Sequence, residues 1–174
     1  MNSPSHEQDT IVSRTFDSPV GPLRARACGG LLLELSFRER LRADGRTSND
    51  NDGLSERILY ATEVQIGEYF AGRRTHFDLP LSLRGPEFNR RVWGQLLKIP
   101  YGKTVSYGQL AADLGLPGGA RAVGVANGAN PVAIVVPCHR VIGADGRLVG
   151  YGGGLHRKRL LLDLESGRVP LELS

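Results

Sequence analysis

The chain has 174 residues, of which 40% are hydrophobic, and a formal net charge of +4 at pH 7. This length suits one ordinary domain or two small domains that share an interface, with enough apolar content for a core. Two cysteines without framework spacing argue against a secreted disulfide scaffold, and the lack of a signal-peptide pattern or a long apolar run predicts a cytoplasmic protein with reduced thiols and no membrane contact.

The first part of the chain is expected to hold a polar tail, a sheet and a loop. Residues 1–10 are polar and are predicted to be disordered. Between residues 11 and 37, short apolar stretches are separated by Pro and Gly, which is typical of a small antiparallel sheet. Residues 38–53 are charged and poor in apolar side chains, so we expect a surface loop there.

A helix is predicted to follow this loop. Ser55 is a favourable N-cap residue, and apolar residues then recur at mostly helical spacing until the pattern stops near Gly72. One more strand is expected at residues 75–81. Together these elements predict an N-terminal α+β domain over residues 11–84, and its chemistry does not indicate a role.

Residues 85–174 are predicted to form a second, mainly helical domain. Pro86 can occupy the first turn of a helix that ends before Pro100. Residues 106–109 read Ser-Tyr-Gly-Gln, which has the form of a capping box. Tyr107 should therefore lie in the opening turn of the next helix.

A turn at residues 116–119 and a second helix over residues 120–128 complete a helix-turn-helix pattern. This second helix is almost bare of large side chains, with Arg121 as its only long cation. A helix that reads bases in the major groove of DNA would carry polar side chains on its exposed face, whereas a slim helix can enter the minor groove. Tight packing between helices would suit small residues equally. The small residues are Gly119, Ala120, Ala122, Gly124, Ala126 and Gly128.

Positive charge is concentrated in the second half of the chain. Residues 85–174 carry 11 basic and 6 acidic side chains, whereas residues 1–84 carry 11 and 12. A basic surface gathers phosphate groups by releasing counterions, so this asymmetry is compatible with a nucleic-acid partner. Many basic proteins bind no nucleic acid, and the charge alone does not decide the matter.

Residues 137–142 read Pro-Cys-His-Arg-Val-Ile and hold the most distinctive chemistry of the chain. They follow a strand-like apolar run, residues 132–136, which should end at Pro137 because proline cannot donate to a β-ladder. Cys138 would then lie at the mouth of a cleft. A thiol becomes nucleophilic as the thiolate, and a neighbouring imidazole or nearby cations lower its pKa. The alternative is a buried structural cysteine, the common fate of a free thiol.

Further motifs stand around this segment in a fixed order. Together they resemble the O6-alkylguanine-DNA alkyltransferases, closely over residues 88–167 and more loosely over the N-terminal half. The resemblance implies an α+β fold, in which a small antiparallel sheet with a helix precedes a mainly α domain that holds the helix-turn-helix and an active-site loop. The motifs are Asp17 to Leu23, Ser106-Tyr107, Arg121-Ala122-Val123-Gly124, Asn130-Pro131, residues 137–142, Tyr151-Gly152-Gly153-Gly154-Leu155 and Glu165.

The resemblance implies an activity. Members of this family flip an alkylated guanine out of the DNA duplex and transfer the alkyl group to a cysteine, which here matches Cys138. A thioether is not a leaving group in the cell, so the acceptor would react once. Double-stranded DNA would be approached through the minor groove by a monomer, without cofactor or metal, and Arg121 would fill the gap left by the flipped nucleotide. The other DNA-binding residues that it implies are Gly119, Ala120, Ala122, Gly124 and Tyr107.

The resemblance also assigns roles around Cys138. His139 would take the thiol proton through a bridging water, and Glu165 would orient the imidazole as in a hydrolase triad. Asn130 would orient the loop under the cysteine, and Tyr107 would donate a proton or hydrogen bond to the departing guanine. Read singly, these residues also have ordinary explanations: a histidine satisfied in the core, a glutamate at a helix C-terminus and a turn-favouring asparagine before proline.

The implied substrate pocket comprises Tyr151, whose ring would pack on the base, the backbone of Gly152 and Gly153, and the neighbours Pro137 and Val141. The N–H of Gly152 would face the departing oxygen. Some relatives carry serine at this position, and a backbone donor survives that change. The consecutive glycines would permit close approach of the base, or they form a plain flexible loop.

Other classes of protein fit the sequence less well. A cysteine hydrolase or acyltransferase would draw its cysteine and histidine from separate elements rather than from adjacent positions. A non-reactive module that only binds alkylated DNA would lack the acceptor cysteine. A helix-turn-helix transcription factor would need a more polar recognition helix, and the four histidines and two cysteines show no ligand pair at zinc-finger spacing.

Overall fold

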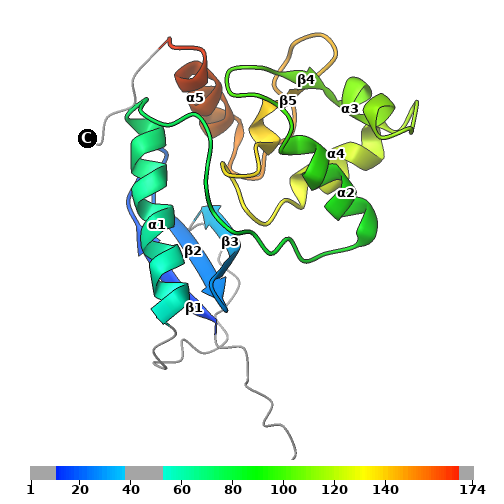
Figure 1. The fold of residues 1–174 in the computed structure, drawn as a ribbon. Coiled ribbons are helices and arrows are strands. Elements are labelled where there is room, and N and C mark those ends of the chain that lie inside the picture. Colours follow the sequence, from blue (N-terminus) through cyan, green and yellow to red (C-terminus); the bar gives the residue numbers. More distant parts are fainter. Residues whose placement is uncertain (1–10, 38–52, 169–174) are drawn as a thin grey trace, which may run out of the picture.

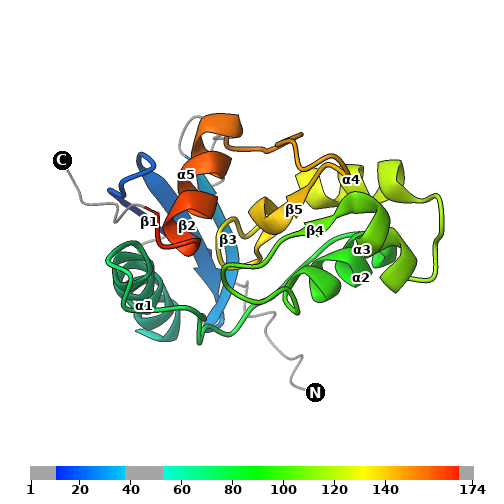
Figure 2. The same ribbon diagram turned by 90° about the horizontal axis from the view of Figure 1, so that it is seen from above.

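The computed structural model describes residues 11–37 and 53–168. The tail predicted at residues 1–10 and nearly all of the loop predicted at residues 38–53 lie outside the described residues. In Figure 1, the sheet and helix α1 of the N-terminal half stand beside a cluster of short helices from the C-terminal half. Seen from above, the sheet lies between α1 and that cluster (Figure 2).

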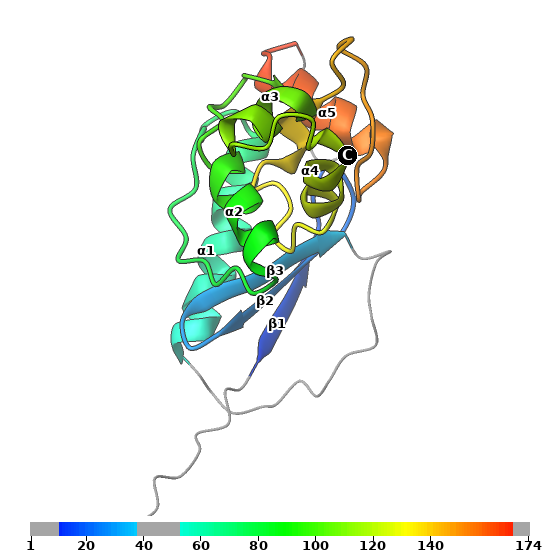
Figure 3. The ribbon, with the colours of Figure 1, turned by 90° about the vertical axis from the view of Figure 1, so that its right-hand side faces the viewer.

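The predicted antiparallel sheet is present, with its strands in the order β1-β2-β3. The strands are β1 (Val12–Phe16), β2 (Leu23–Cys28) and β3 (Leu31–Phe37). Central strand β2 is buried along almost its whole length, because α1 (Gly53–Phe70) covers one face of the sheet and the C-terminal helices stand on the other side (Figure 3). The sheet is therefore an internal layer and not a surface module.

Two predictions for the N-terminal half are wrong. Ser55 does not cap α1, because the helix already includes Gly53; the Ser55 hydroxyl is buried and accepts a hydrogen bond from the N–H of Gly30 at 3.3 Å. The strand expected at residues 75–81 forms, among the described residues, an isolated parallel bridge from Leu81 to Leu32. A proline at position 80 cannot donate to a ladder, which limits the pairing there.

The helix-turn-helix prediction is confirmed. The Ser106 hydroxyl caps α3 by accepting a hydrogen bond from the N–H of Gln109 at 3.1 Å. The Gln109 side chain turns away and donates to Asp113 at 2.8 Å, so half of the predicted capping box forms. The C-terminal helices are α2 (Glu87–Leu96), α3 (Tyr107–Asp113), α4 (Ala120–Gly128) and α5 (Leu155–Glu165).

The apolar run before Cys138 is not a strand, contrary to the prediction. Residues 132–136 form a tight turn, in which the N–H of Val136 donates to the carbonyl of Val132 at 2.9 Å and Ile134 has a φ of +71°. Every side chain of a short buried turn can be apolar, as in a buried strand. The hydrophobic pattern alone therefore cannot separate the two.

Two pairings fix this turn and the segment that follows. The N–H of Leu35 in β3 donates to the carbonyl of Pro131 at 3.0 Å, and the N–H of Ala133 donates back to Leu35 at 2.8 Å. Beyond the cysteine, β4 (Val105–Ser106) pairs in parallel with β5 (Val141–Ile142). The cysteine segment is thus held between the N-terminal sheet and the start of α3.

One hydrophobic core runs through both halves of the molecule. It includes Leu35 of the sheet, Tyr69 of α1, Trp93 of α2 and Leu161 of α5. The division into two domains at residue 84 stays a prediction. No helix in the described part of the chain is both long enough and apolar enough to cross a membrane.

Candidate active site

Cys138 opens a short 3-10 helix, η2 (Cys138–Arg140), and lines a pocket with only 6% of the residue exposed. Burial raises the pKa of its thiol, while a hydrogen bond from Asn130 and the charge of Lys158 act in the opposite direction. The protonated thiol is therefore the resting form at neutral pH. A base must take its proton before the sulfur can act as a nucleophile.

His139, the next residue, is the candidate base. Burial lowers the pKa of its fully buried imidazole, although Glu165 acts in the opposite direction, so the ring is neutral at neutral pH. Its Nε2 lies 2.8 Å from Oε1 of Glu165 and must donate, because a carboxylate can only accept. The ring proton is thereby fixed on Nε2, and Nδ1, which has no hydrogen-bond partner within residues 11–37 and 53–168, keeps its lone pair.

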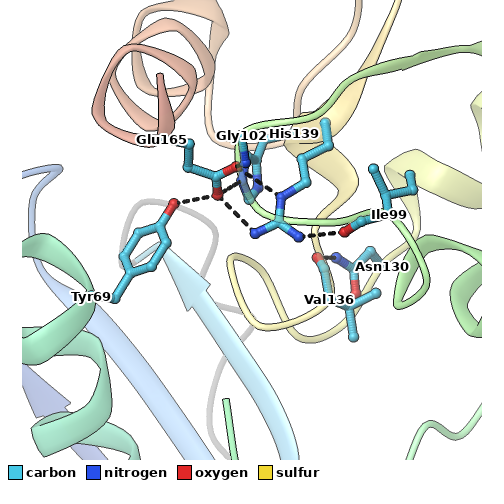
Figure 4. A network of polar contacts seen from close by, with 8 residues as sticks. Tyr69, Ile99, Gly102, Asn130, Val136, His139 and Glu165 are labelled. Atoms are coloured by element: carbon cyan, nitrogen blue, oxygen red, sulfur yellow. Dashed lines mark hydrogen bonds and ion pairs between the residues drawn. The ribbon is translucent and has the colours of Figure 1, made fainter. Parts of the chain in front are cut away.

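Glu165, the last residue of α5, collects donors from three parts of the chain (Figure 4). Besides His139, Oε1 accepts from the Tyr69 hydroxyl at 2.8 Å and from Arg140 at 2.9 Å. Oε2 accepts from Nε of Arg140 at 2.8 Å and from the N–H of Gly102 at 3.1 Å. Burial alone would raise the pKa of this carboxyl, but the hydrogen bonds from His139 and Arg140 hold the pKa well below its usual range. Glu165 is a fixed buried anion.

Sequence reasoning gave no role to Tyr69 or Arg140. Burial and the neighbouring Glu165 charge raise the pKa of Tyr69 well above its usual value, so the phenol remains a donor. Arg140 also donates to the carbonyl of Ile99 at 2.6 Å, which ties η2 to the end of α2. Arg140 could have been found from its place beside His139 in the motif. Tyr69 reads as one more apolar position of a helix.

Asn130 holds the turn beneath Cys138. Its Nδ2 donates to the carbonyl of Val136 at 2.8 Å (Figure 4), and its Oδ1 accepts from the N–H of Val132 at 3.0 Å. Both are contacts with the backbone of the turn before the cysteine, where the resemblance placed Asn130. They fix the conformation of the chain directly before the cysteine.

A second buried cation, which the sequence analysis did not identify, lies close to the cysteine. Lys158 of α5 is fully buried and donates to the carbonyls of Val141 at 2.5 Å, Val149 at 3.0 Å and Gly150 at 3.3 Å. Burial lowers the pKa of Lys158 to about 8, although the charge of Cys138 acts in the opposite direction. The ammonium group therefore remains mostly protonated at neutral pH, and the three backbone carbonyls accept its hydrogen bonds.

The pocket beside Cys138 lies between the two halves of the chain. Three of the predicted pocket residues, Tyr151, Gly152 and Gly153, lie on its wall, and strand β3 supplies a side that the sequence did not predict. The Phe37 and Tyr151 rings meet edge to face, with their centres 6.0 Å apart. The wall consists of Leu35, Ser36, Phe37, Asn127, Gly128, Asn130, Ala133, Cys138, Tyr151, Gly152 and Gly153.

Three other predicted site residues lie near the cysteine. Within the part of the chain that the structure describes, they do not belong to the pocket wall. Pro137 and Val141 are buried on either side of η2 in the chain. The Tyr107 ring is half-buried, and its hydroxyl donates to the carbonyl of Val149 at 3.0 Å. Burial raises the pKa of Tyr107, with the nearby Cys138 acting in the same direction, so the phenol is protonated at neutral pH.

Comparison with known proteins identifies this arrangement. Residues 87–167 match the family model of the 6-O-methylguanine DNA methyltransferase DNA binding domain, and residues 11–83 match that of its ribonuclease-like domain. The chain belongs to the 6-O-methylguanine DNA methyltransferase family. The resemblance seen in the sequence and the α+β fold expected from it are both confirmed.

Relatives in this methyltransferase family match over most of their length. The methylated-DNA--protein-cysteine methyltransferase of Mycobacterium tuberculosis H37Rv is 52% identical over 163 residues, which cover 92% of this chain and 96% of the relative. That of Mycolicibacterium paratuberculosis is 52% identical over 166 residues, covering 94% and 98%. The crystal structure of Mycobacterium tuberculosis OGT in complex with DNA superposes with a TM-score of 0.82 at 51% identity, covering 91% of this chain and 94% of that one.

In this member of the methyltransferase family, the helix-turn-helix presents a smooth outer face. Arg121, Ala122 and Gly128 of α4 are exposed, and Val125 is 71% exposed. Arg121 is the long side chain on this face. A slim apolar face with one cation is the arrangement that the sequence analysis associated with the minor groove.

Other small residues of the helix-turn-helix serve packing. A Cβ at Gly119 would lie 2.9 Å from the carbonyl oxygen of Leu116, and one at Gly124 would lie 3.7 Å from the Tyr107 ring. Gly119 is therefore needed for the turn itself, and Gly124 lies directly against the tyrosine. Packing therefore accounts for Gly119 and Gly124, and the approach of the other small residues to DNA stays a prediction.

Proposed function

We propose that this chain repairs O6-alkylguanine in double-stranded DNA by moving the alkyl group onto Sγ of Cys138, once per molecule. The observation that carries the proposal is the position of Cys138 on a pocket wall beside a neutral His139 whose proton is fixed on Nε2 by Glu165. Family membership and the similarity to a DNA complex support DNA as the partner. The extruded base would enter the pocket.

The reaction proceeds in two linked steps. Nδ1 of His139 takes the thiol proton through a bridging water, and the positive charge that the ring gains is balanced by the carboxylate of Glu165. The sulfur of Cys138 then forms a bond to the alkyl carbon as the bond between that carbon and O6 breaks, and the electron pair of the broken bond goes to the guanine. The thioether cannot leave again, so the molecule reacts once.

The departing guanine needs a proton or hydrogen bond to neutralise its negative charge. Tyr107 supplies it, because its raised pKa keeps the phenol protonated. To reach the base, the Tyr107 hydroxyl must exchange its bond to Val149 for one to the base. Lys158, whose Nζ lies 5.8 Å from the centre of the Tyr107 ring, supplies positive charge while the sulfur is anionic.

The wall formed by Tyr151, Gly152 and Gly153 receives the base. The Tyr151 ring packs on the purine, the backbone N–H of Gly152 faces the departing oxygen, and Gly153 leaves room for the base. A Cβ at Gly153 would lie 2.4 Å from the Phe37 ring, so this position requires glycine in any case. Pro137 and Val141 support Cys138 from the two sides of η2.

DNA approaches the exposed face of α4 through its minor groove. Arg121 enters the stack where the nucleotide has left, while the small side chains of Ala120 and Ala122 allow the helix to come close to the DNA backbone. Gly119 and Gly124 support this approach indirectly, because they permit the turn before α4 and its packing on Tyr107. The protein acts as a monomer and its location is the cytoplasm.

Intact mass spectrometry tests the proposed function. After incubation with a duplex that contains one O6-methylguanine, the wild-type protein should gain one methyl group, mapped to Cys138. The variant Cys138→Ala should gain none. Cys28→Ala removes the other buried cysteine and should gain the methyl group like the wild type. A wild-type protein that stays unmodified with excess lesion would overturn the proposal, and multiple turnover of an ester would favour a cysteine hydrolase.

A further inference from the structure

We infer that Arg157 is a positioning residue, whose guanidinium bonds the backbone of Val20 to that of Gly153 and so lets the N-terminal sheet fix the loop at residues 150–154. The inference rests on the proposed function, because its effect is seen in the rate of alkyl transfer to Cys138. It also gives a role to the motif at residues 17–23, which is part of the family resemblance and takes no part in the chemistry of the thiol.

Arg157 lies in the first turn of α5 and is only 8% exposed, although arginine is rarely buried unless it is paired. Its Nε donates to the carbonyl of Val20 at 2.6 Å, and its Nη1 donates to the carbonyl of Gly153 at 2.9 Å. A cation in the first turn is unfavourable to the helix dipole, so α5 itself gains nothing from this charge. Its place is explained by the two carbonyls that it joins, which lie 137 and 4 residues before it in the chain.

The turn between β1 and β2 is shaped to receive the guanidinium. The N–H of Gly21 donates to the carbonyl of Ser18 at 2.9 Å, and the Ser18 hydroxyl donates to the carbonyl of Gly21. Gly21 has a φ of +98°, and a Cβ at this position would lie 3.2 Å from Nη2 of Arg157. The turn therefore needs glycine for its backbone conformation, and the missing side chain leaves room for Arg157.

Phe37, the last residue of β3, connects the same guanidinium to the sheet a second time. The guanidinium carbon of Arg157 lies 4.8 Å from the centre of the Phe37 ring, within the range of a cation–π contact. The ring also meets Tyr151 edge to face, and it lies so close to Gly153 that a Cβ there would be 2.4 Å away. Arg157 and Phe37 therefore contact each other, and both lie against Gly153.

The loop at residues 150–154 needs such support from outside, because every residue in it except Tyr151 is glycine. Glycine loses more backbone freedom on ordering than any other residue. Lys158 bonds the carbonyls of Val149 and Gly150 where the loop begins, and Arg157 bonds Gly153 near its end. Adjacent residues of α5 thus hold both ends of the loop, and Arg157 also ties it to the sheet.

The expected effect on the reaction follows from the position of this loop. Gly152 and Gly153 lie on the pocket wall with Cys138, and a misplacement of about 1 Å at a reacting site can lower the rate by about 100-fold. Within residues 11–37 and 53–168, Arg157 is not part of that wall, so it acts through the loop. Loss of the guanidinium should therefore slow the reaction without removing any group that touches the base.

The test measures single-turnover methylation of Cys138 by a saturating duplex that contains one O6-methylguanine. The rate constant reports the geometry of the site in folded molecules, whereas the amplitude reports the fraction of molecules that are folded and active. Arg157→Met keeps a long side chain beside Phe37 but has no donor, and its rate constant should fall by about 10-fold. Its affinity for an undamaged duplex should be unchanged, because the buried Arg157 offers no surface to DNA.

Three further variants sharpen this test. Arg159→Met removes an exposed cation from the same helix and should keep the wild-type rate constant. Arg157→Lys restores the charge without the planar fork of donors, and should stay at least about 3-fold slower than the wild type. Gly21→Ala disturbs the contact from the side of the N-terminal turn, and should lower the rate constant as Arg157→Met does.

Amide hydrogen exchange follows the loop directly. The N–H of Gly154 donates to the carbonyl of Tyr151 at 3.0 Å, so its protection reports how often the loop opens. Exchange in residues 150–155 should be faster in Arg157→Met than in Arg159→Met.

Two outcomes would overturn the inference. A wild-type rate constant in Arg157→Met, with only the amplitude reduced, would show that the residue stabilises the fold and does not position the loop. A wild-type rate constant in Arg157→Lys would show that charge alone suffices, and this variant decides the question should Arg157→Met fail to fold. Failure of the proposed function itself looks different, because Cys138 of the wild type would then remain unmodified.

Discussion

Cys138 has two unlike sides. On the inner side, the Glu165 carboxylate is buried and bonded to Tyr69, His139, Arg140 and a backbone N–H, so the proton arrangement is complete before any substrate arrives. On the outer side, α4 carries the exposed Arg121 and, on the pocket wall, Asn127, whose Oδ1 has no hydrogen-bond partner within residues 11–37 and 53–168. In the proposed function, the inner side fixes the chemistry and the bound DNA completes the outer side. Such preorganisation of charge is a general source of catalytic power.

Removing the negative charge of Glu165, on the inner side of Cys138, should have the largest effect. Glu165→Gln leaves the buried Arg140 guanidinium without its counter-charge and places an amide against several donors, so the free energy of unfolding should fall by about 3–5 kcal/mol. Urea unfolding measures this loss. The matched control is Glu63→Gln, which removes an exposed partner of Arg14 at 3.0 Å and should cost less than about 1 kcal/mol. Similar losses in the two variants would contradict the distinction between the inner side and an ordinary surface.

Arg121→Ala should impair the outer side, which meets the DNA, and leave the chemistry of the inner side intact. Repair of duplex DNA should slow by about 10- to 100-fold, because extrusion of a base costs a few kcal/mol that an inserted side chain partly offsets. Reaction with free O6-benzylguanine needs no extrusion and should be unchanged. The control Arg74→Ala removes an arginine that bonds Glu68 beside α1, and should affect neither substrate. Equal losses on duplex and free base would refute the role of Arg121.

Lowering the pH should reduce the stability of the fold in two stages, first through His139 and then through Glu165. The pKa of His139 is lowered by folding, so below its unfolded value of about 6.5 the unfolded chain binds more protons, and stability falls by up to about 1.4 kcal/mol per pH unit. The lowered pKa of Glu165 adds a further loss below about pH 4.3. Unfolding free energies measured between pH 8 and pH 2 check both parts of this pH dependence. A flat profile between pH 7 and pH 5 would argue against a neutral buried His139.

The smallest effect is expected from removing the Tyr69 hydroxyl, which bonds Glu165 on the inner side of Cys138. Tyr69→Phe removes one of several donors to Glu165, so stability should fall by about 1 kcal/mol and alkylation should stay within about 3-fold. Thermal unfolding and single-turnover alkylation measure the two quantities. Tyr60→Phe, an exposed position of the same helix, should change neither. A loss of reactivity as large as that of Glu165→Gln would mean that Tyr69 takes part in the proton transfer itself.

Local signals predicted much of the fold. The Pro and Gly punctuation around residues 11–37 gave the sheet, and the Ser106 cap with the turn after Leu114 gave the helix-turn-helix, because each depends on near neighbours in sequence. Ser55 and residues 132–136 were misread because tertiary contacts override local preference there. The Ser55 hydroxyl bonds a hairpin backbone, and the apolar turn is shaped by Asn130.

The residues of the candidate site also fall into two groups, those that the sequence pointed to and those that only the folded structure brings out. The motif around Cys138 drew attention to His139, and resemblance to a family drew attention to Asn130 and Glu165. Tyr69 lies 96 residues from Glu165 in the chain, and no local pattern connects them. The β3 wall and Asn127 likewise become visible only when the chain is folded, since their surroundings and not their residue types give them meaning.

Ile134 shows what the fold imposes on this segment. Its φ of +71° lies in a region that β-branched residues disfavour, and its side chain is fully buried. The surrounding core and the Asn130 bonds hold the backbone in this conformation. A peptide cut from residues 130–140 would relax to an extended form, and its thiol would behave as in any short peptide. The reactivity of the Cys138 thiol therefore depends on the folded structure and does not follow from the sequence motif alone.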